Sequence, residues 1–299
     1  MSQHSVAALD GAVLGASLFE PNVPVRDTPA VLINSATGVR RRFYHDFASF
    51  LSTKGFVVAT YDYRGIGDSR PPSLRGYHAT MRDWGTLDLA AMIDWLGDQF
   101  PERPVRIVAH SVGGQLLGLA PNADRVTAML AVGAQSGWWG HWPRPRRYAN
   151  ALLWYVLVPG LSRALGYFPS RRLGLGEDLP AGVALEWARW CRNRDYMVDE
   201  RGTPLRPYFD RFTGSLLALS IDGDPFAPRA SVAALVSWYA NASIRLEQID
   251  QSSFGLSRLG HFGFFRAGVA LPLWSHAASW LLMPGPSEFT SSASVLGRN

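Results

Sequence analysis

Three side chains that could pass a proton along a line lie far apart in the sequence. Ser111 lies in the segment VAHSVGGQ, with the small residues Ala109 two positions before it and Gly113 two positions after it. A serine hydroxyl is a weak nucleophile at neutral pH, so it needs a general base, and a histidine base needs a carboxylate to orient it. The chain has candidates for both roles after Ser111, in the order carboxylate and then histidine.

The candidate acid and the candidate base each follow an apolar run. Asp222 and Asp224 end the segment LALSIDGD, and His261 lies in the glycine-flanked segment SRLGHFGFFR. Because ligands bind at the carboxyl ends of the strands in an open α/β sheet, we expect these side chains to converge with Ser111 at that edge. On the residues alone, both aspartates are candidates for the acid.

The small residues around Ser111 predict a sharp turn from a strand into a helix. Such a turn lifts the hydroxyl out of the sheet and places it at a helix N-terminus. There the backbone N–H of Val112 and the helix dipole can stabilise a developing oxyanion.

Strands and helices alternate along most of the chain, which predicts an α/β fold with a mostly parallel central sheet and helices on both faces. The runs rich in Val, Ile and Ala are typical of strands that are buried on both faces. Asp10 and Gly11, between two apolar runs, predict an N-terminal hairpin. The expected strands are residues 29–36, 55–64, 104–111, 125–134, 214–224 and 243–250, and the expected helices are residues 43–54, 83–100, 113–119, 147–158, 181–194, 228–239 and 271–282.

The alternation stops between residues 138 and 211, which are rich in Trp, Arg, Pro and Gly. Structureless loops longer than roughly 12–15 residues are uncommon, so we expect a mainly helical insertion here. The predicted core then consists of residues 1–137 and 212–284. The Ser-rich residues 285–299 are predicted to form a flexible tail.

Several segments together resemble the α/β-hydrolase superfamily. Residues 109–113 resemble its nucleophile elbow, G-x-S-x-G, with Ala109 in place of the first glycine. The order serine, acid, histidine is also that of the family. Residues 61–69, YDYRGIGDS, are similar to the segment D-x-R-G-x-G-x-S, and residues 33–38, INSATG, lie where the family has its oxyanion loop.

This resemblance implies an α/β-hydrolase fold with a cap at residues 138–211 and a triad of Ser111, His261 and Asp224. Asp224 is preferred over Asp222 because it lies four residues before Pro228, as the acid does in family members.

The oxyanion loop departs from the family because it lacks the usual His-Gly pair. By position, the resemblance implies the N–H of Thr37 as the second oxyanion donor, beside that of Val112. The implied reaction is the hydrolysis of carboxylic esters or thioesters through an acyl-enzyme, without a cofactor. An amidase, a peptidase or an acyltransferase with the same triad, and a non-catalytic binding protein with this fold, are the alternatives.

Composition narrows the partners that we expect. The formal net charge is +5, but residues 138–211 alone contain 12 arginines and 7 acidic residues, so the rest of the chain is balanced. A uniformly basic protein would suggest nucleic-acid binding, whereas a basic block on a neutral body suggests a local feature, so no nucleic-acid partner is expected. The resemblance implies a small-molecule ester or acyl substrate instead. The histidines lack the spaced partners of a metal site, so no metal is expected. Cys191 is the single cysteine and is expected to pack in the interior.

No apolar run is long enough to cross a bilayer, and the N-terminus lacks the pattern of a signal peptide, so we expect a cytoplasmic protein without a transmembrane segment. The sequence does not determine the oligomeric state, and a homodimer is one of the possibilities.

The insertion holds six of the eleven tryptophans, which either hold a small cap together or wall an apolar pocket. Arg144, Arg146 and Arg147 either form a solvated face or attract an anionic ester. Membrane contact through these tryptophans and arginines is a third alternative.

Two further interpretations concern structure alone. His110 is expected to be structural, because neighbouring residues of a strand point to opposite faces and His110 then cannot easily reach the Ser111 hydroxyl. Asp62 and Arg64 are expected to pair with each other and brace their loop.

Overall fold

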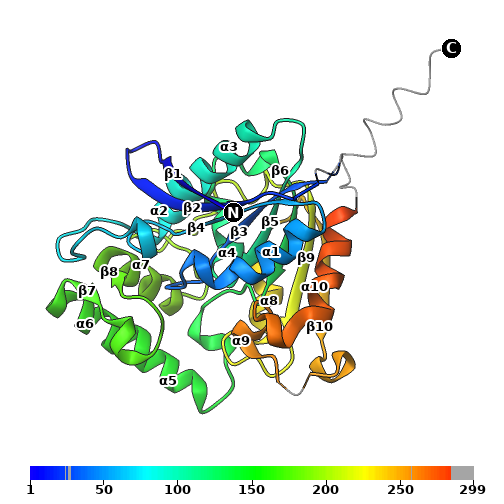
Figure 1. The fold of residues 1–299 in the computed structure, drawn as a ribbon. Helices are drawn as coiled ribbons and strands as arrows, with labels where there is room; N and C mark the ends of the chain where they lie inside the picture. The colour runs from blue at the N-terminus through cyan, green and yellow to red at the C-terminus, as the bar shows by residue number, and fades with distance from the viewer. Residues whose placement is uncertain (24, 26–27, 257, 284–299) are drawn as a thin grey trace.

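An eight-stranded sheet organises the chain, in the spatial order β1-β2-β4-β3-β5-β6-β9-β10 (Figure 1). The computed structural model describes residues 1–23, 25, 28–256 and 258–283, so the expected tail at 285–299 lies outside the described residues. The strands are β1 (Ser2–Ala7), β2 (Val13–Phe19), β3 (Ala30–Asn34), β4 (Val57–Tyr61), β5 (Val105–His110), β6 (Val126–Val132), β9 (Ser215–Ile221) and β10 (Ser243–Ile249).

The predicted mostly parallel sheet is confirmed. The hairpin of β1 and β2 turns at Asp10 and Gly11, and β2 pairs antiparallel with β4. All other neighbours pair in parallel. Every residue of β3, β4 and β5 is buried, as expected for strands covered on both faces.

Helices cover both faces of the sheet. Alternate strand residues feed two apolar clusters, with Leu32 in one and Ile33 in the other. The helices of the core are α1 (His45–Thr53), α2 (Met81–Asp83), α3 (Ala90–Gln99), α4 (Gly113–Leu116), α8 (Arg229–Val236), α9 (Gly260–Gly263) and α10 (Ala267–Leu282). α1 and α10 contribute to the cluster of Ile33, and α3 and α8 to the cluster of Leu32.

The order of the strands shows where along the sheet edge a ligand would bind. The chain proceeds from β3 to β4 on one side, and then β5 joins β3 on the other side. Ligands bind outside the carboxyl ends of the strands at such a reversal. Thr37 follows β3 and Ser111 follows β5, so both lie at this point of the sheet edge.

The insertion between β6 and β9 is mainly helical and lies beside the carboxyl ends of the strands (Figure 1). It contains α5 (Arg146–Leu152), α6 (Val158–Leu165), the short pair β7 (Tyr167–Phe168) and β8 (Leu179–Pro180), and α7 (Ala181–Arg192). A π-helical turn, Leu153–Leu157, joins α5 to α6, so one helical run extends from 146 to 165.

The predicted end of this helix at residue 158 is wrong. Pro159 lies inside this run, directly after the π-helical turn, and such turns and prolines often occur together where a helix bends without ending. The chain therefore continues as a helix to Leu165 and ends at Gly166, which has a φ of 75°. None of the helices in the described ranges combines the length and apolarity that a bilayer crossing requires.

The expected pair of Asp62 and Arg64 is wrong. The buried carboxylate of Asp62 accepts hydrogen bonds from the backbone N–H and the guanidinium of Arg41. Arg64 instead donates to Asp88, at 2.7 Å, and to Asp10, at 2.6 Å. The partners come from segments far away in the sequence, so spacing along the chain could not identify them.

Asp62→Ala should lower the free energy of unfolding by about 3 kcal/mol, because it leaves the buried guanidinium of Arg41 without its buried partner. Asp68→Ala is the matched control. Asp68 also pairs with Arg41, at 2.7 Å, but its side chain is 71% exposed, so the loss should stay below about 1 kcal/mol. Equilibrium unfolding in urea measures both, and equal losses would contradict the importance of the buried pair.

Candidate active site

The turn expected at Ser111 is present. Ser111 has a φ of 54°, in the left-handed region that non-glycine residues rarely adopt, and its N–H donates to the Val132 carbonyl at 3.1 Å. A Cβ at position 113 would lie 2.6 Å from the Asn34 carbonyl oxygen. A Cβ at position 114 would lie 2.6 Å from the Ala134 Cβ. The glycine pair therefore lets α4 begin directly against β3 and the segment after β6, with Ser111 just before its start.

His261 and Asp224 lie together beside this turn. His261 Nδ1 donates to Asp224 Oδ2 at 2.7 Å, and both side chains are buried. The other carboxylate oxygen accepts the backbone N–H groups of Phe226, at 2.7 Å, and Ala227, at 3.2 Å. These bonds hold the carboxylate so that its second oxygen faces the imidazole.

Asp222, the alternative acid, lies elsewhere. It is exposed and accepts a hydrogen bond from the side chain of Gln248 on β10. Two residues of a tight turn thus face opposite environments, and Asp224, which the family resemblance preferred, is the one that contacts His261.

The Ser111 hydroxyl faces a residue that the sequence analysis missed. Its Oγ lies 3.5 Å from both Oε1 and Nε2 of Gln135, at the outer limit of hydrogen-bond distance. In the described part of the chain, no hydrogen bond joins Ser111 to His261, although both line the same cavity. The available signal was the position of Gln135, a polar residue just after β6 at the same sheet edge.

Gln135 belongs to a polar chain that links the insertion to α4. Its backbone carbonyl accepts from Gln115 Nε2 at 2.6 Å, and Gln115 Oε1 accepts from the Tyr196 hydroxyl at 3.0 Å. The Tyr196 oxygen in turn accepts from the Trp187 indole at 3.1 Å. These bonds connect two insertion residues with the region of Ser111.

The backbone N–H groups of Thr37 and Val112, the expected oxyanion donors, have no acceptor among the described residues. The N–H of Ala36 is occupied, because it donates to the Tyr44 hydroxyl at 2.8 Å. Thr37 lines the cavity with Ser111, and Val112 is buried at the start of α4. Two unused donors thus lie on either side of the reversal in strand order.

His110 forms a bridge behind the site. The Tyr44 hydroxyl donates to His110 Nδ1 at 2.8 Å, and His110 Nε2 donates to the carbonyl of His261 at 3.0 Å. Burial holds the pKa of His110 well below its ordinary value, and the neighbouring His261 lowers this pKa further. The neutral ring is required, because a protonated Nδ1 could not accept from Tyr44. This arrangement fits the expected structural role.

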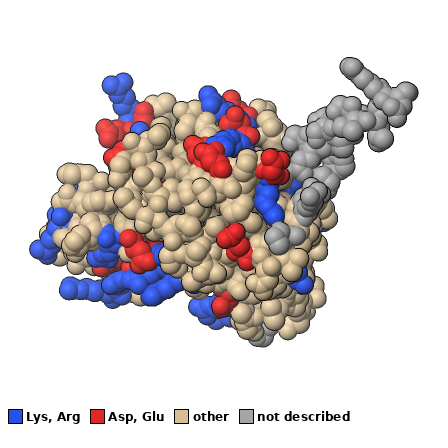
Figure 2. Space-filling model, turned by 45° about the horizontal axis from the view of Figure 1, so that its top comes forward, with Lys and Arg blue, Asp and Glu red and all other residues tan. Residues whose placement is uncertain are grey.

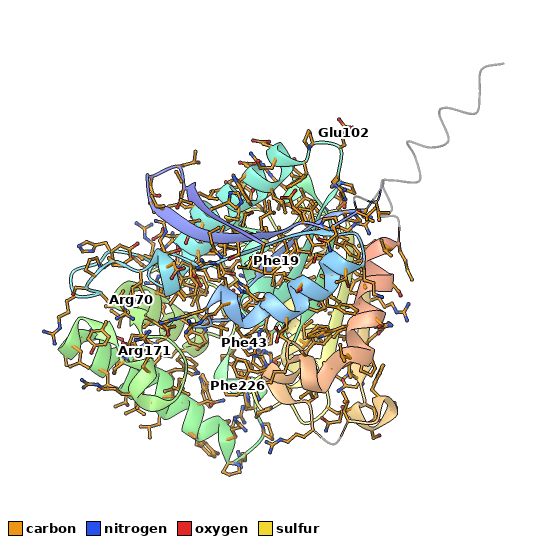
Figure 3. The ribbon with its side chains drawn as sticks, viewed as in Figure 1. Phe19, Phe43, Arg70, Glu102, Arg171 and Phe226 are labelled. Atoms are coloured by element: carbon orange, nitrogen blue, oxygen red, sulfur yellow. The ribbon has the colours of Figure 1, made fainter. Side chains whose placement is uncertain are left out.

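A cavity of about 280 Å³ opens at Ser111, between the sheet edge and the insertion. Ser111, Gln135, Thr37 and His261 form a polar end. Figure 3 shows Phe226 between the insertion and the C-terminal elements, where its ring lies 5.2 Å from that of His261. The remaining wall is largely apolar and includes Leu153, Trp154, Val158, Phe168, Leu179 and Trp187.

Three of the six tryptophans of the insertion line the cavity, and the other three pack elsewhere in the protein. Trp142, Trp154 and Trp187 line the cavity, whereas Trp138, Trp139 and Trp190 do not. Cys191 is buried and also reaches the cavity wall, where burial raises the pKa of its thiol well above the ordinary value. A protonated thiol there is consistent with packing.

Of Arg144, Arg146 and Arg147, only one lines the cavity. Arg146 lines the cavity, with its guanidinium 5.8 Å from the Phe226 ring. Arg144 instead lies over Tyr148, and Arg147 over Trp139. Within the described residues, no group of three or more His, Cys, Asp or Glu side chains could hold a metal ion.

Comparison with known proteins gives one family match. Residues 9–162, just over half of the chain, match the family model described as serine aminopeptidase, S33. A stretch of 76 residues, 25% of this chain, is 40% identical to the lysophosphatidylserine lipase ABHD12 of Gallus gallus and spans 17% of that protein. The same lipase of Mus musculus matches equally over 16% of its length. The match thus spans about a sixth of these relatives.

Solved structures share the fold. A soluble variant of the monoglyceride lipase of Saccharomyces cerevisiae superposes with a TM-score of 0.66 and 14% identity, over 94% of this chain and 96% of that one. An esterase of Exiguobacterium antarcticum superposes with a TM-score of 0.61 and 17% identity, over 94% of this chain and 100% of that one.

His110 should make stability depend on pH. The unfolded chain protonates this histidine below about pH 6.5, whereas the native state does not, so the free energy of unfolding falls as the pH falls below that value. His110→Gln keeps one donor and one acceptor but does not titrate. Its free energy of unfolding should decline less steeply between pH 6.5 and 5, by up to about 1.4 kcal/mol per pH unit.

Urea unfolding at several pH values measures this slope. His45 and His141, whose pKa values are also lowered by burial, contribute equally to both proteins. An unchanged slope in the variant would show that His110 takes up its proton in the native state.

Proposed function

Because the chain belongs to the serine aminopeptidase S33 family, within the α/β-hydrolase superfamily, we propose that it is a serine hydrolase that cleaves carboxylic esters or thioesters. One observation carries the proposal. A single cavity is lined by Ser111, at a φ of 54°, and by His261, which Asp224 holds at 2.7 Å. These are the nucleophile, base and orienting acid that acyl transfer requires.

In the proposed reaction, Ser111 Oγ attacks the carbonyl carbon of the substrate while its proton passes to His261 Nε2. Asp224 stabilises the imidazolium through Nδ1. The oxyanion receives the N–H groups of Val112 and Thr37. The C–O bond to the alcohol then breaks, and the alcohol leaves with the proton from His261. Water, deprotonated by His261, hydrolyses the acyl-enzyme and restores Ser111.

The Ser111 hydroxyl must turn from Gln135 toward His261 before the attack. Its contacts at 3.5 Å are weak, so this rotation costs little. Catalytic hydrogen bonds are often open without substrate and tighten when it binds.

The walls of the cavity support an ester over a peptide substrate. An aminopeptidase needs a carboxylate to bind the terminal ammonium group of its substrate. The lining residues described here include no Asp or Glu and do include Arg146. The apolar wall suits an acyl or alkyl chain. The similar proteins reported above, a lysophosphatidylserine lipase, a monoglyceride lipase and an esterase, are also named for the cleavage of esters.

We further propose that residues 138–211 are a cap on the core formed by residues 1–137 and 212–284. Residues of the insertion supply most of the apolar wall, including Leu153 and Trp154 of the π-helical turn, Val158 of α6 and Trp187 of α7. The polar chain from Trp187 to Gln115 fastens this cap to the helix that begins after Ser111.

Ser111→Ala should lower kcat for nitrophenyl esters by at least about 1,000-fold, because the acyl-enzyme can no longer form. Asp224→Asn should lower kcat by a similar factor, since the imidazole loses its orienting carboxylate. Asp222→Asn is the matched control in the same turn and should retain activity. Hydrolysis rates and covalent labelling by a fluorophosphonate measure these effects. Unchanged rates and labelling in Ser111→Ala would rule out the proposed nucleophile.

Arg146→Glu should raise KM several-fold for an ester with a negatively charged acyl group and leave KM for a neutral ester of equal size nearly unchanged. The reason is that Arg146 is the one of the three arginines that lines the cavity. Arg144→Glu, at a residue outside the lining, is the control and should shift KM less. Equal shifts for charged and neutral esters would contradict a preference for anions.

A further inference from the structure

The outer side of the helical run from 146 to 165 is apolar and exposed. Tyr148, Leu152, Tyr155 and Val156 are 54%, 55%, 52% and 55% exposed. Their spacing places them on one side of the helical run, and we call these four residues the outer face. The opposite side holds Trp154 and Val158, which are 8% and 1% exposed and pack toward the cavity.

The segment that carries this face is basic. Residues 138–176 contain six arginines and no aspartate or glutamate. Two guanidinium groups lie over rings of the outer face, Arg144 at 5.8 Å from the Tyr148 ring and Arg192 at 5.6 Å from the Tyr155 ring. Figure 2 shows basic side chains gathered along the lower left of the molecule, on the side where α5 and α6 lie in Figure 1.

Most of these cations have no counter-ion in the protein. Among the described residues, no carboxylate lies within 4.0 Å of Arg144, Arg146, Arg163 or Arg172. Arg171 differs, because it pairs with Glu177 at 2.6 Å. The outer face is therefore an apolar strip between cations that are free to bind external anions.

We propose that this chain docks on an anionic lipid bilayer through the outer face. A helix with an apolar side and arginines at its margins lies in the plane of a membrane interface, with its apolar side chains among the acyl chains and its cations at the headgroups. A bilayer presents one sign of charge over its whole surface, which matches a segment that carries only one sign. A second copy of the chain would bring the same positive charge, so repulsion opposes self-association through this face.

The docked orientation also places the cavity. Leu175 and Phe226 line the cavity and are 48% and 42% exposed, and Arg146 lines it from the same helix that carries the outer face. The mouth of the cavity therefore lies beside the membrane-facing strip. The docking itself does not depend on the proposed hydrolase activity.

Sedimentation with lipid vesicles tests the proposal. The full chain should sediment with vesicles of phosphatidylcholine mixed with phosphatidylglycerol, and much less with phosphatidylcholine alone. High salt should weaken the binding, because it screens the arginines. Absence of binding to the anionic vesicles, or equal binding to both kinds, would overturn the proposal.

Variants locate the contact. The double variant Leu152→Ser with Val156→Ser should bind anionic vesicles about tenfold more weakly or less, since two apolar side chains no longer enter the bilayer. Leu271→Ser, which removes a leucine that is 52% exposed on α10, is the matched control and should bind as the original chain does.

Neither variant changes a residue of the cavity wall, so circular dichroism and hydrolysis of a soluble ester check that both fold. Loss of vesicle binding in the control as well would contradict docking through the outer face. Sedimentation equilibrium tests whether a second copy of the chain binds the outer face instead of a membrane. A dimer that dissociates in the double variant would assign the face to a second copy of the chain and overturn the membrane proposal.

Discussion

Close packing at the junction of β5 and α4 is the constraint on which the site depends. Ser111 keeps a left-handed backbone at a junction where β3 and the segment after β6 approach so closely that only glycine fits at positions 113 and 114. A strained residue persists only where its surroundings determine its conformation. Here the surroundings are the two strands that flank β5, so the central sheet itself holds the hydroxyl at its edge.

A second set of bonds sets the loops around that hydroxyl. The loop after β3, the helix α1 and the loop of His261 are joined through Ala36, Tyr44 and His110, in an order that only a neutral His110 allows. On the other side, Trp187, Tyr196 and Gln115 tie the insertion to α4. The loop of His261 and the loop of Thr37 therefore share one buried bridge, although they lie far apart in the sequence. Rigid supports of this kind keep reacting groups within the narrow range that catalysis tolerates.

The insertion has two apolar sides with different partners. Its inner side, with Trp154 and Val158, forms the wall of the cavity, and its outer side faces solvent between arginines. A short helical layer between a cavity and the surface buries only one side against the protein, so the other needs either polar residues or an external apolar partner. In this chain, the composition of the outer side fits the second case.

The sequence by itself determined the alternation of strands and helices, the hairpin at Asp10 and the turn at Ser111, because these follow from local periodicity and from residues with special backbone preferences. The order serine, acid, histidine also made the site recognisable through its family. The residues alone left Asp222 and Asp224 open, and the family resemblance preferred Asp224, which contacts His261 in the structure. Only the tertiary structure decided that Asp62 pairs with Arg41 and not with Arg64, and that Gln135 faces Ser111. Each of these contacts joins segments that are brought together by strand pairing. Neighbouring side chains in a turn can point to a buried imidazole or to solvent, and that difference depends on the surrounding packing rather than on residue type or spacing.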